Sequence, residues 1–426
     1  MSETAAPITF TELTGRTILD SRGWPTVEVR ARLDDGTCLV ASAPAGASTG
    51  KHEAIELRDH DDAYSGRGVR AAVAGINNDI AELVTGRRWE TITEFDRALR
   101  ELDGTSGYSR LGANAVVAIS ITAARAFAHS AGLELHQWIA WQSGSTQRLP
   151  VPHFNVLNGG AHAANILDFQ EFMIAPVGAD NEEHAIEIGA EIYRALADLI
   201  RHRFGSAGLG DEGGFAPQIE DPRAALDLLT EAITTAGYTP GVEDVAIALD
   251  PAANSFYLGA EKYHVNGLDI GRRQLVDYYC DLIASYPIRS IEDGFSEEDP
   301  DGWVAMYQAA SGRIQLVGDD LYVTDRDLIR EGAAHDYSNA VLIKPNQVGT
   351  VTQTLEAVAA ARESGMACMV SHRSGETSDS FIADLVVGTG VGQIKSGAPA
   401  RGERVAKYNR LAEIALDHPD IPYGLV

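Results

Sequence analysis

Six short apolar runs in the second half of the sequence each end in a charged or imidazole side chain. The terminal residues follow one another at intervals of 42, 27, 25, 28 and 23 residues and are Asp250, Glu292, Asp319, Lys344, His372 and Lys395. Carboxylates from different strands of a rigid frame are the hard oxygen ligands that suit octahedral Mg²⁺. A lysine beside such a cation is expected to have a depressed pKa and to act as a general base. A lysine base and divalent cations together can remove a weakly acidic proton next to a carboxylate.

Some of the charged residues and motifs in this sequence have simpler explanations than catalysis. A single Asp after a strand more often caps the next helix, but six such residues in register are harder to explain in that way. The segment with His52, Glu53 and Glu56 lacks the second histidine of a zinc motif, and we interpret it as a plain helical face. GASTGK at 46–51 has three residues between its glycines where a nucleotide-binding P-loop has four, so we reject an NTPase.

The intervals predict the elements that position these side chains. Each interval accommodates one strand, one helix and two loops of a βα unit. Two further apolar runs at 154–160 and 172–178 bring the number of predicted strands to eight. A barrel of eight such strands collects the residues at the carboxyl ends of its strands on one face. The functional side chains are therefore expected to converge there.

The first part of the chain has a different pattern. Half-alternating strands at 26–33 and 37–44 are joined by Asp34-Asp35-Gly36, which favours a three-stranded antiparallel meander. Helical periodicity follows at 69–86 and 111–132. Polar residues and two prolines interrupt the pattern near 143–152. We therefore predict an α+β domain over 1–142 and a barrel domain over 143–426, which makes the fold class α/β.

Composition excludes several classes of protein. The chain has 426 residues, of which 45% are apolar and 22% are charged, and its net charge is −27. This acidity disfavours nucleic acid and anionic membranes as partners. The opening residues do not resemble a signal peptide, and the chain has no apolar stretch long enough to span a membrane. Three widely spaced cysteines predict no disulfide framework, so we expect a cytoplasmic location.

Many motifs resemble those of the enolase family, in the same order from about residue 15 to about residue 411. They include ILDSRGWPTVEV, AGASTGKHEAIELRD, QEFMIAPVGA, GDEGGFAP, ALDPAANSFY, YPIRSIED, VGDDLYVT, LIKPNQVGT, VSHRSGET and GQIKSGAPARGERVAKYN. The resemblance implies a small α+β domain followed by a barrel of ββαα(βα)₆ order. It also implies reversible dehydration of 2-phosphoglycerate to phosphoenolpyruvate with two Mg²⁺ per active site, the second bound with substrate.

The resemblance further implies a role for each matched residue. Lys344 resembles the base that takes the C2 proton, and Glu212 resembles the acid that assists departure of the C3 hydroxyl, with Glu171 beside it. That role requires a raised pKa for Glu212. The remaining implied roles are metal binding by Asp250, Glu292, Asp319 and Ser48, contacts to the carboxylate and hydroxyl ends by Lys395 and His162, phosphate binding by Arg373 and Ser374, and completion of the wall by His372 and Gln170.

Four positions depart from the family motifs: Trp24, Ala45, Gly402 and Glu413. Glu413 stands where the family has an arginine that pairs across the dimer with the residue equivalent to Glu28, so two acids would repel unless Arg410 substitutes. The resemblance still implies a homo-oligomer, either a dimer or an octamer built from dimers. The changes at positions 24, 45 and 402 raise the alternative of a paralogue acting on a related phosphorus compound, such as a carboxyphosphonoenolpyruvate synthase. A non-catalytic scaffold or surface-binding protein is the third hypothesis.

Overall fold

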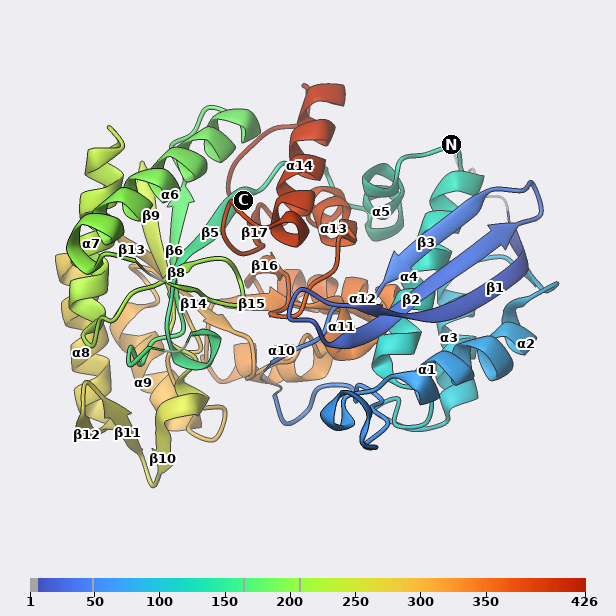
Figure 1. Ribbon diagram of the computed structural model, residues 1–426, viewed down its shortest axis with the longest axis horizontal. Helices are drawn as coiled ribbons and strands as arrows, with labels where there is room; N and C mark the ends of the chain where they lie inside the picture. The colour runs from blue at the N-terminus through green and yellow to red at the C-terminus, as the bar shows by residue number, and fades with distance from the viewer. Residues whose placement is uncertain (1–6, 48–49, 164, 207) are drawn as a thin grey trace.

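The computed structural model describes residues 7–47, 50–163, 165–206 and 208–426. An antiparallel sheet with its helices, built from the first part of the chain, lies beside a closed barrel (Figure 1). The predicted α/β class is therefore confirmed. Helix α5 (Leu135–Ser143) comes last before the barrel, and the boundary between residues 142 and 143 stays a prediction.

The predicted meander is present at the N-terminus. Strands β1 (Ile8–Leu19), β2 (Pro25–Leu33) and β3 (Cys38–Ser42) pair antiparallel. The short strand β4 (Arg88–Trp89) pairs with the other edge of β1, so the order is β3-β2-β1-β4.

The two predicted helical segments of this part form, although the first is interrupted and further helices lie outside the predicted segments. The segment at 69–86 forms α1 (Arg70–Gly75), a π-helical turn (Ile76–Ile80) and α2 (Ala81–Val84), and the segment at 111–132 forms α4 (Ala113–Ser130). In the π-helical turn the Asn77 side chain accepts a hydrogen bond from Gly15 N and donates one to Gly15 O. Helix α3 (Ile92–Asp103) was not predicted, although Thr91 caps it by accepting a hydrogen bond from Glu94 N at 3.1 Å.

All eight predicted barrel strands form. They are β5 (Val151–Asn158), β6 (Glu171–Pro176), β9 (Val245–Asp250), β13 (Ile288–Glu292), β14 (Gln315–Gly318), β15 (Ala340–Ile343), β16 (Ala367–Ser371) and β17 (Gln393–Lys395). Each strand pairs with the next, and β17 pairs with β5 to close the barrel. Strand β6 alone runs antiparallel to both of its neighbours, with Glu171 opposite Asn158 and Asp250. The first residue of β6 therefore lies at the end of the barrel where the other strands finish.

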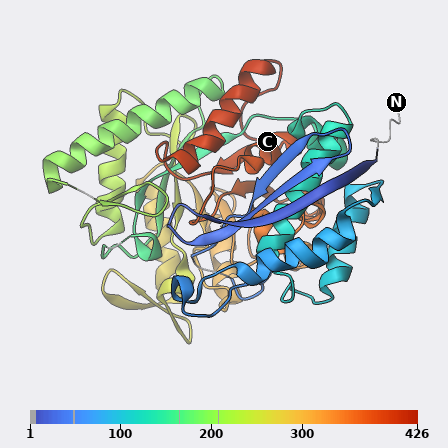
Figure 2. The same ribbon diagram turned by 45° about the vertical axis from the view of Figure 1, so that its right-hand side comes forward.

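Helices surround the barrel (Figure 2) in the order that ββαα(βα)₆ requires. They are α6 (Glu182–Phe204), α7 (Pro222–Thr235), α8 (Arg272–Ser285), α9 (Pro300–Ala310), α10 (Arg326–Ala334), α11 (Pro345–Val348), α12 (Val351–Glu363), α13 (Phe381–Thr389) and α14 (Gly402–Asp417). Two small elements lie outside this pattern. One is the hairpin of β7 (Gly208–Leu209) and β8 (Phe215–Ala216), and the other is the three-stranded sheet of β10 (Tyr257–Gly259), β11 (Lys262–Val265) and β12 (Leu268–Gly271).

Helix α4 joins the two parts of the molecule. Nearly all of its residues are buried, as expected for a helix that is apolar on every side. Ser120 of α4 accepts a hydrogen bond from Val351 N, and Asp96 of α3 accepts one from Thr352 N, each 2.9 Å long. In the described part of the chain no single helix could span a membrane, and α4 with α5 meets the length and composition criteria only as a pair bent by 95°.

We predict that Gly189→Ala destabilises the barrel by about 1–3 kcal/mol because a Cβ there would overpack the core. Gly189 lies in α6, and an added Cβ would stand 2.4 Å from the Phe154 ring of β5. Gly402→Ala is the matched control, since a Cβ at that position in α14 would have no neighbour within 4 Å. Urea unfolding should show a loss for the first variant and no loss for the second. Equal midpoints for both variants would contradict this account of α6 packing.

Candidate active site

Lys395, the last residue of β17, lies among carboxylates from three other strands. Its Nζ is 2.8 Å from the Glu292 carboxylate, 3.2 Å from Asp250 Oδ2 and 3.2 Å from Glu171 Oε2. The lysine and its three partners are all buried. Burial lowers the pKa of the Lys395 ammonium, but the surrounding carboxylates raise it well above its usual range. The predicted convergence of side chains at the carboxyl ends of the strands is therefore present.

Lys344 follows β15 and forms a buried ion pair with Asp319, the residue after β14. Gln347 Nε2 donates a 2.9 Å hydrogen bond to the other oxygen of Asp319. The expected depression of the lysine pKa depends on a neighbouring cation and stays a prediction. Burial lowers the pKa of Lys344, but the charge of Asp319 outweighs this effect and raises it.

Glu212 and Glu171 flank His162, whose Nδ1 is 3.6 Å from one oxygen of each acid. Asn155 Nδ2 donates a 2.8 Å hydrogen bond to Glu212. Burial raises the pKa of both acids, and the charge of Glu212 raises that of Glu171 further. The neighbouring His372 and His162 reverse the effect at Glu212 and lower its pKa well below the usual range. The expectation of a raised pKa at Glu212 is therefore wrong, and Glu171 is the acid that retains its proton more readily.

Arg404 of α14 orients His372. Its guanidinium donates hydrogen bonds to His372 Nδ1 and to the carbonyl oxygens of Arg373 and Ser374. Because Nδ1 accepts this hydrogen bond, the neutral imidazole carries its proton on Nε2, which lies 3.2 Å from Glu212 Oε2. Burial lowers the pKa of His372 to about 4. Arg404 was missed as a functional residue, since nothing in its sequence context indicates that it reaches the loop after β16.

The predicted phosphate residues lie next to loops from the N-terminal part of the chain. Arg373 Nη1 is 2.9 Å from Glu53 Oε2, and both side chains are buried. Arg22 Nη1 donates a 3.3 Å hydrogen bond to Ser374 Oγ. The interpretation of the segment with Glu53 and Glu56 as a plain helical face is wrong, because the backbone at 54–60 adopts no helix and Glu53 points at the barrel.

Further acids lie beside the predicted metal ligands. Asp293 follows Glu292, and its two carboxylate oxygens accept 2.9 Å hydrogen bonds from the backbone N–H groups of Asp319 and Asp320. Burial and the charge of Asp319 raise the pKa of Asp320 to about 7. Asp320 and the buried Gln170 line a cleft of about 430 Å³. Both extra acids directly follow predicted ligands, which is the signal that could have identified them.

The structure groups potential metal ligands differently from the predicted set. Near the barrel end, potential ligand atoms lie within 4.8 Å of one another in Asp293–Asp319–Asp320 and in His162–Glu171–Glu212. Among the described residues, Asp250, Glu292 and Asp319 do not form such a set. Their carboxylates instead contact Lys395 and Lys344. Ser48, predicted to reach a second ion, lies outside the described residues.

The positions that depart from the family motifs lie around these loops. The guanidinium of Arg67 stacks 4.4 Å above the Trp24 ring. Ala45 is buried, and its backbone pairs with Gly375 through hydrogen bonds of 2.7 and 2.9 Å. Gly402 begins α14, and a Cβ added at this position would have no neighbour within 4 Å. The indole therefore contacts an arginine of the N-terminal part of the chain.

Arg410 contacts acids of its own chain. It lies 2.8 Å from both Asp384 and Glu413 and 3.2 Å from Glu134. Glu28 in turn pairs with Arg16 and Arg30. These contacts do not favour Arg410 as a replacement for the arginine that pairs across the dimer.

Two family profiles match this chain. The profile described as "Enolase, N-terminal domain" matches residues 10–139, and that described as "Enolase, C-terminal TIM barrel domain" matches residues 146–418. Curated relatives named enolase are similar over nearly the whole length. The chain is 51% identical to that of Mycobacterium leprae over 94% of this chain and 92% of the relative. It is 50% identical to that of Mycobacteroides abscessus over the same shares, and 49% identical to that of Natranaerobius thermophilus over 95% and 94%.

A closed barrel that presents lysines, histidines and acids at one end defines an α/β-barrel enzyme of the acid–base class. Within that class, the chain belongs to the enolase family.

We predict that Glu53→Gln destabilises the protein by about 3 kcal/mol because it removes the carboxylate that pairs with the buried Arg373 charge. Inorganic phosphate should then raise the unfolding midpoint of the variant more than that of the wild type, since the anion no longer competes with Glu53. Urea unfolding with and without phosphate measures both effects. Glu56→Gln is the control, because Glu56 pairs with the more accessible Arg58 and should lose less than about 1 kcal/mol. Equal losses in the two variants would contradict the importance of the Glu53–Arg373 pair.

Proposed function

We propose that this protein catalyses the reversible dehydration of 2-phosphoglycerate to phosphoenolpyruvate. The observation that carries the proposal is the pair of buried lysines set among acids at one end of the barrel. The reaction removes a proton from C2 and a hydroxyl group from C3, so it needs a base and an acid in one site. The near-complete match to relatives named enolase supports this reaction over that of a divergent paralogue.

Lys344 is the proposed base. Its amine takes the C2 proton, which leaves the electron pair to delocalise into the neighbouring carboxylate of the substrate. The side chain is buried and held by Asp319, so its position is fixed before substrate arrives. Lys395 ends β17, which is separated from β15 by one strand, β16. It is proposed to hold the carboxylate end of the substrate. The Lys395 ammonium group and the Arg373 guanidinium offset the strongly negative charge of the chain at the place where the anion must enter.

The acid pair Glu212 and Glu171 is proposed to deliver a proton to the departing C3 hydroxyl. The pKa of Glu171 is raised and that of Glu212 is lowered by their surroundings, which supports a shared role of the two acids in handling one proton. His162 lies between the two acids and can donate a hydrogen bond to the departing C3 hydroxyl. His372 and Gln170 complete the wall, and Arg373 with Ser374 is proposed to bind the phosphate.

The donor chemistry fits magnesium, because Asp250, Glu292 and Asp319 offer carboxylate oxygens and the buried Glu292 Oε2 receives no hydrogen bond of good geometry. To share one ion, these carboxylates would turn from their contacts with Lys395 and Lys344 toward one another. When bound, Mg²⁺ supplies positive charge that stabilises the charge developing on the substrate carboxylate. We propose that these three residues hold the tighter ion and that Ser48 reaches a second ion bound with substrate.

Oligomeric state, location and domain boundary complete the proposal. We propose a homo-oligomer, a cytoplasmic location and a boundary between residues 142 and 143. The described cysteines Cys38, Cys280 and Cys368 are free thiols, which supports a reducing compartment.

Lys344→Ala should lower turnover by about 10³-fold or more, because general-base catalysis is lost. The ultraviolet absorbance of phosphoenolpyruvate formed from 2-phosphoglycerate with Mg²⁺ measures this loss. The variant should also lose exchange of the C2 hydrogen with deuterated solvent. Glu212→Gln should retain that exchange and lose elimination, since it leaves the base intact.

Lys262→Ala is the matched control, because Lys262 is exposed on β11. It should retain full turnover and exchange. Turnover by Lys344→Ala at the level of this control would overturn the assignment of the base. Loss of C2 exchange in Glu212→Gln would overturn the separation of the two roles. Absence of turnover in the wild type would overturn the proposed reaction.

A further inference from the structure

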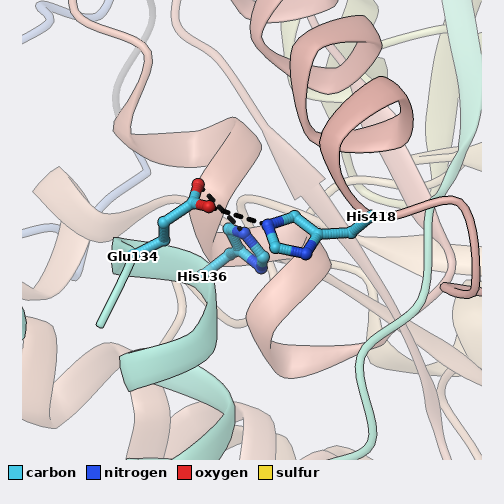
Figure 3. A group of neighbouring side chains, drawn as sticks. All are labelled: Glu134, His136 and His418. Carbon is cyan, nitrogen blue, oxygen red and sulfur yellow. Dashed lines mark hydrogen bonds and ion pairs between the residues drawn. The ribbon is translucent and has the colours of Figure 1, made fainter. Parts of the chain in front are cut away.

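A cluster of two histidines and one glutamate lies outside the active site, at the joint between α5 and α14. Glu134 precedes α5, His136 lies in its first turn, and His418 ends α14. Figure 3 shows the three side chains converging, with both oxygens of Glu134 directed at the imidazoles. His418 Nε2 is 2.7 Å from Glu134 Oε1, and His136 Nε2 is 3.4 Å from Glu134 Oε2.

Hydrogen bonding accounts for only part of this cluster. The His418–Glu134 contact is a hydrogen bond, but the side chain of His136 is fully buried and its Nε2 makes no hydrogen bond in the described structure. A buried imidazole nitrogen without a partner costs free energy. This nitrogen is aimed at the same glutamate that His418 binds, which places three donor atoms around one point.

From this arrangement we propose that His136 Nε2, His418 Nε2 and a carboxylate oxygen of Glu134 form a binding site for a divalent transition-metal ion of the Zn²⁺ class. The donor atoms all lie within 4.8 Å of one another. Tetrahedral Zn²⁺ with nitrogen and oxygen ligands places neighbouring donors about 3.3 Å apart, so small side-chain rotations suffice. Two imidazoles select against Mg²⁺, which prefers oxygen ligands. Water takes the fourth position.

Neighbouring side chains orient the ligands of this site and contribute charge to it. Gln147 Nε2 lies 3.0 Å from His136 Nδ1, and turning its amide lets Oε1 accept the Nδ1 proton when Nε2 binds a metal. Asp384 and Glu413 lie close by through their contacts with Arg410. Arg410 also contacts Glu134 Oε2 at 3.2 Å and competes with a cation there, but it retains its two other carboxylates when that contact is released. The side chain of Glu134 is 39% exposed, which leaves an entry path.

The site is separate from the catalytic acids and clamps two parts of the chain. His418 lies 14 residues after Arg404, which corresponds to about 21 Å along a helix. Glu134 and His136 fall within the match to the N-terminal family profile, and His418 ends the match to the barrel profile. Bound metal would therefore join the two parts and stabilise the folded chain by mass action.

The test measures metal binding to the full chain in excess Mg²⁺, so that the catalytic acids are occupied. Equilibrium dialysis against Zn²⁺ should give one more bound equivalent for the wild type than for His418→Gln. Visible absorption of bound Co²⁺ should show a four-coordinate spectrum in the wild type that His418→Gln lacks. Zn²⁺ should raise the melting temperature of the wild type and leave that of His418→Gln unchanged.

His129→Gln is the matched control, because His129 forms an exposed pair with Asp35 and belongs to none of the potential metal-ligand groups among the described residues. It should bind Zn²⁺ like the wild type. Gln147→Leu keeps all three ligands and should weaken binding by about 10–100-fold through loss of orientation, which tests the site without removing a ligand. Equal Zn²⁺ stoichiometry and equal melting shifts in the wild type and His418→Gln would overturn the proposal. These readouts do not depend on turnover, so they are independent of the proposed reaction.

Discussion

Charge balance inside the end of the barrel constrains the rest of the structure. The ammonium group of Lys395 compensates carboxylates from three strands, and Lys344 compensates Asp319 of a fourth. Each of these charges alone would be costly to bury, because water is excluded and the interior responds weakly to charge. Together they form a network in which removal of one member leaves another unpaired. The carboxylates proposed to bind Mg²⁺ are therefore partly compensated by lysine charge before any cation binds.

The direction of β6 decides how many acids this network holds. A barrel made only of parallel strands would place Glu171, the first residue of its strand, at the opposite end from Asp250. Because β6 runs antiparallel, Glu171 lies opposite Asp250 and reaches both Lys395 and His162. Six apolar runs that end in charged or imidazole residues, with two further apolar runs, predicted all eight strands and the end at which the site forms. Period and spacing carry no information about strand direction, which came only from the family resemblance.

Contacts between distant segments were beyond sequence reasoning. Glu53 and Arg373 are separated by 320 residues and Arg22 and Ser374 by 352, and in each case a loop of the N-terminal part completes a barrel loop. Local patterns describe neighbours along the chain, so Glu53 resembled one more exposed acid. The pKa direction expected at Glu212 failed for the same reason. That expectation considered only the neighbouring carboxylates, whereas the histidines beside Glu212 decide the net effect.

Helix α14 connects the active site to the joint between the two parts of the chain. Near its first turn, Arg404 fixes the imidazole of His372 and two carbonyl groups of the phosphate loop. In its middle, Arg410 binds Asp384 of α13, and at its end His418 binds Glu134 before α5. A helix is stiff along its axis, so a shift at His418 moves Arg404 with it. The positions of His372 and of the loop after β16 therefore depend on how firmly the end of α14 is held to the N-terminal part. The catalytic geometry of the barrel is thus a property of the whole chain, although every proposed reacting group comes from the barrel itself.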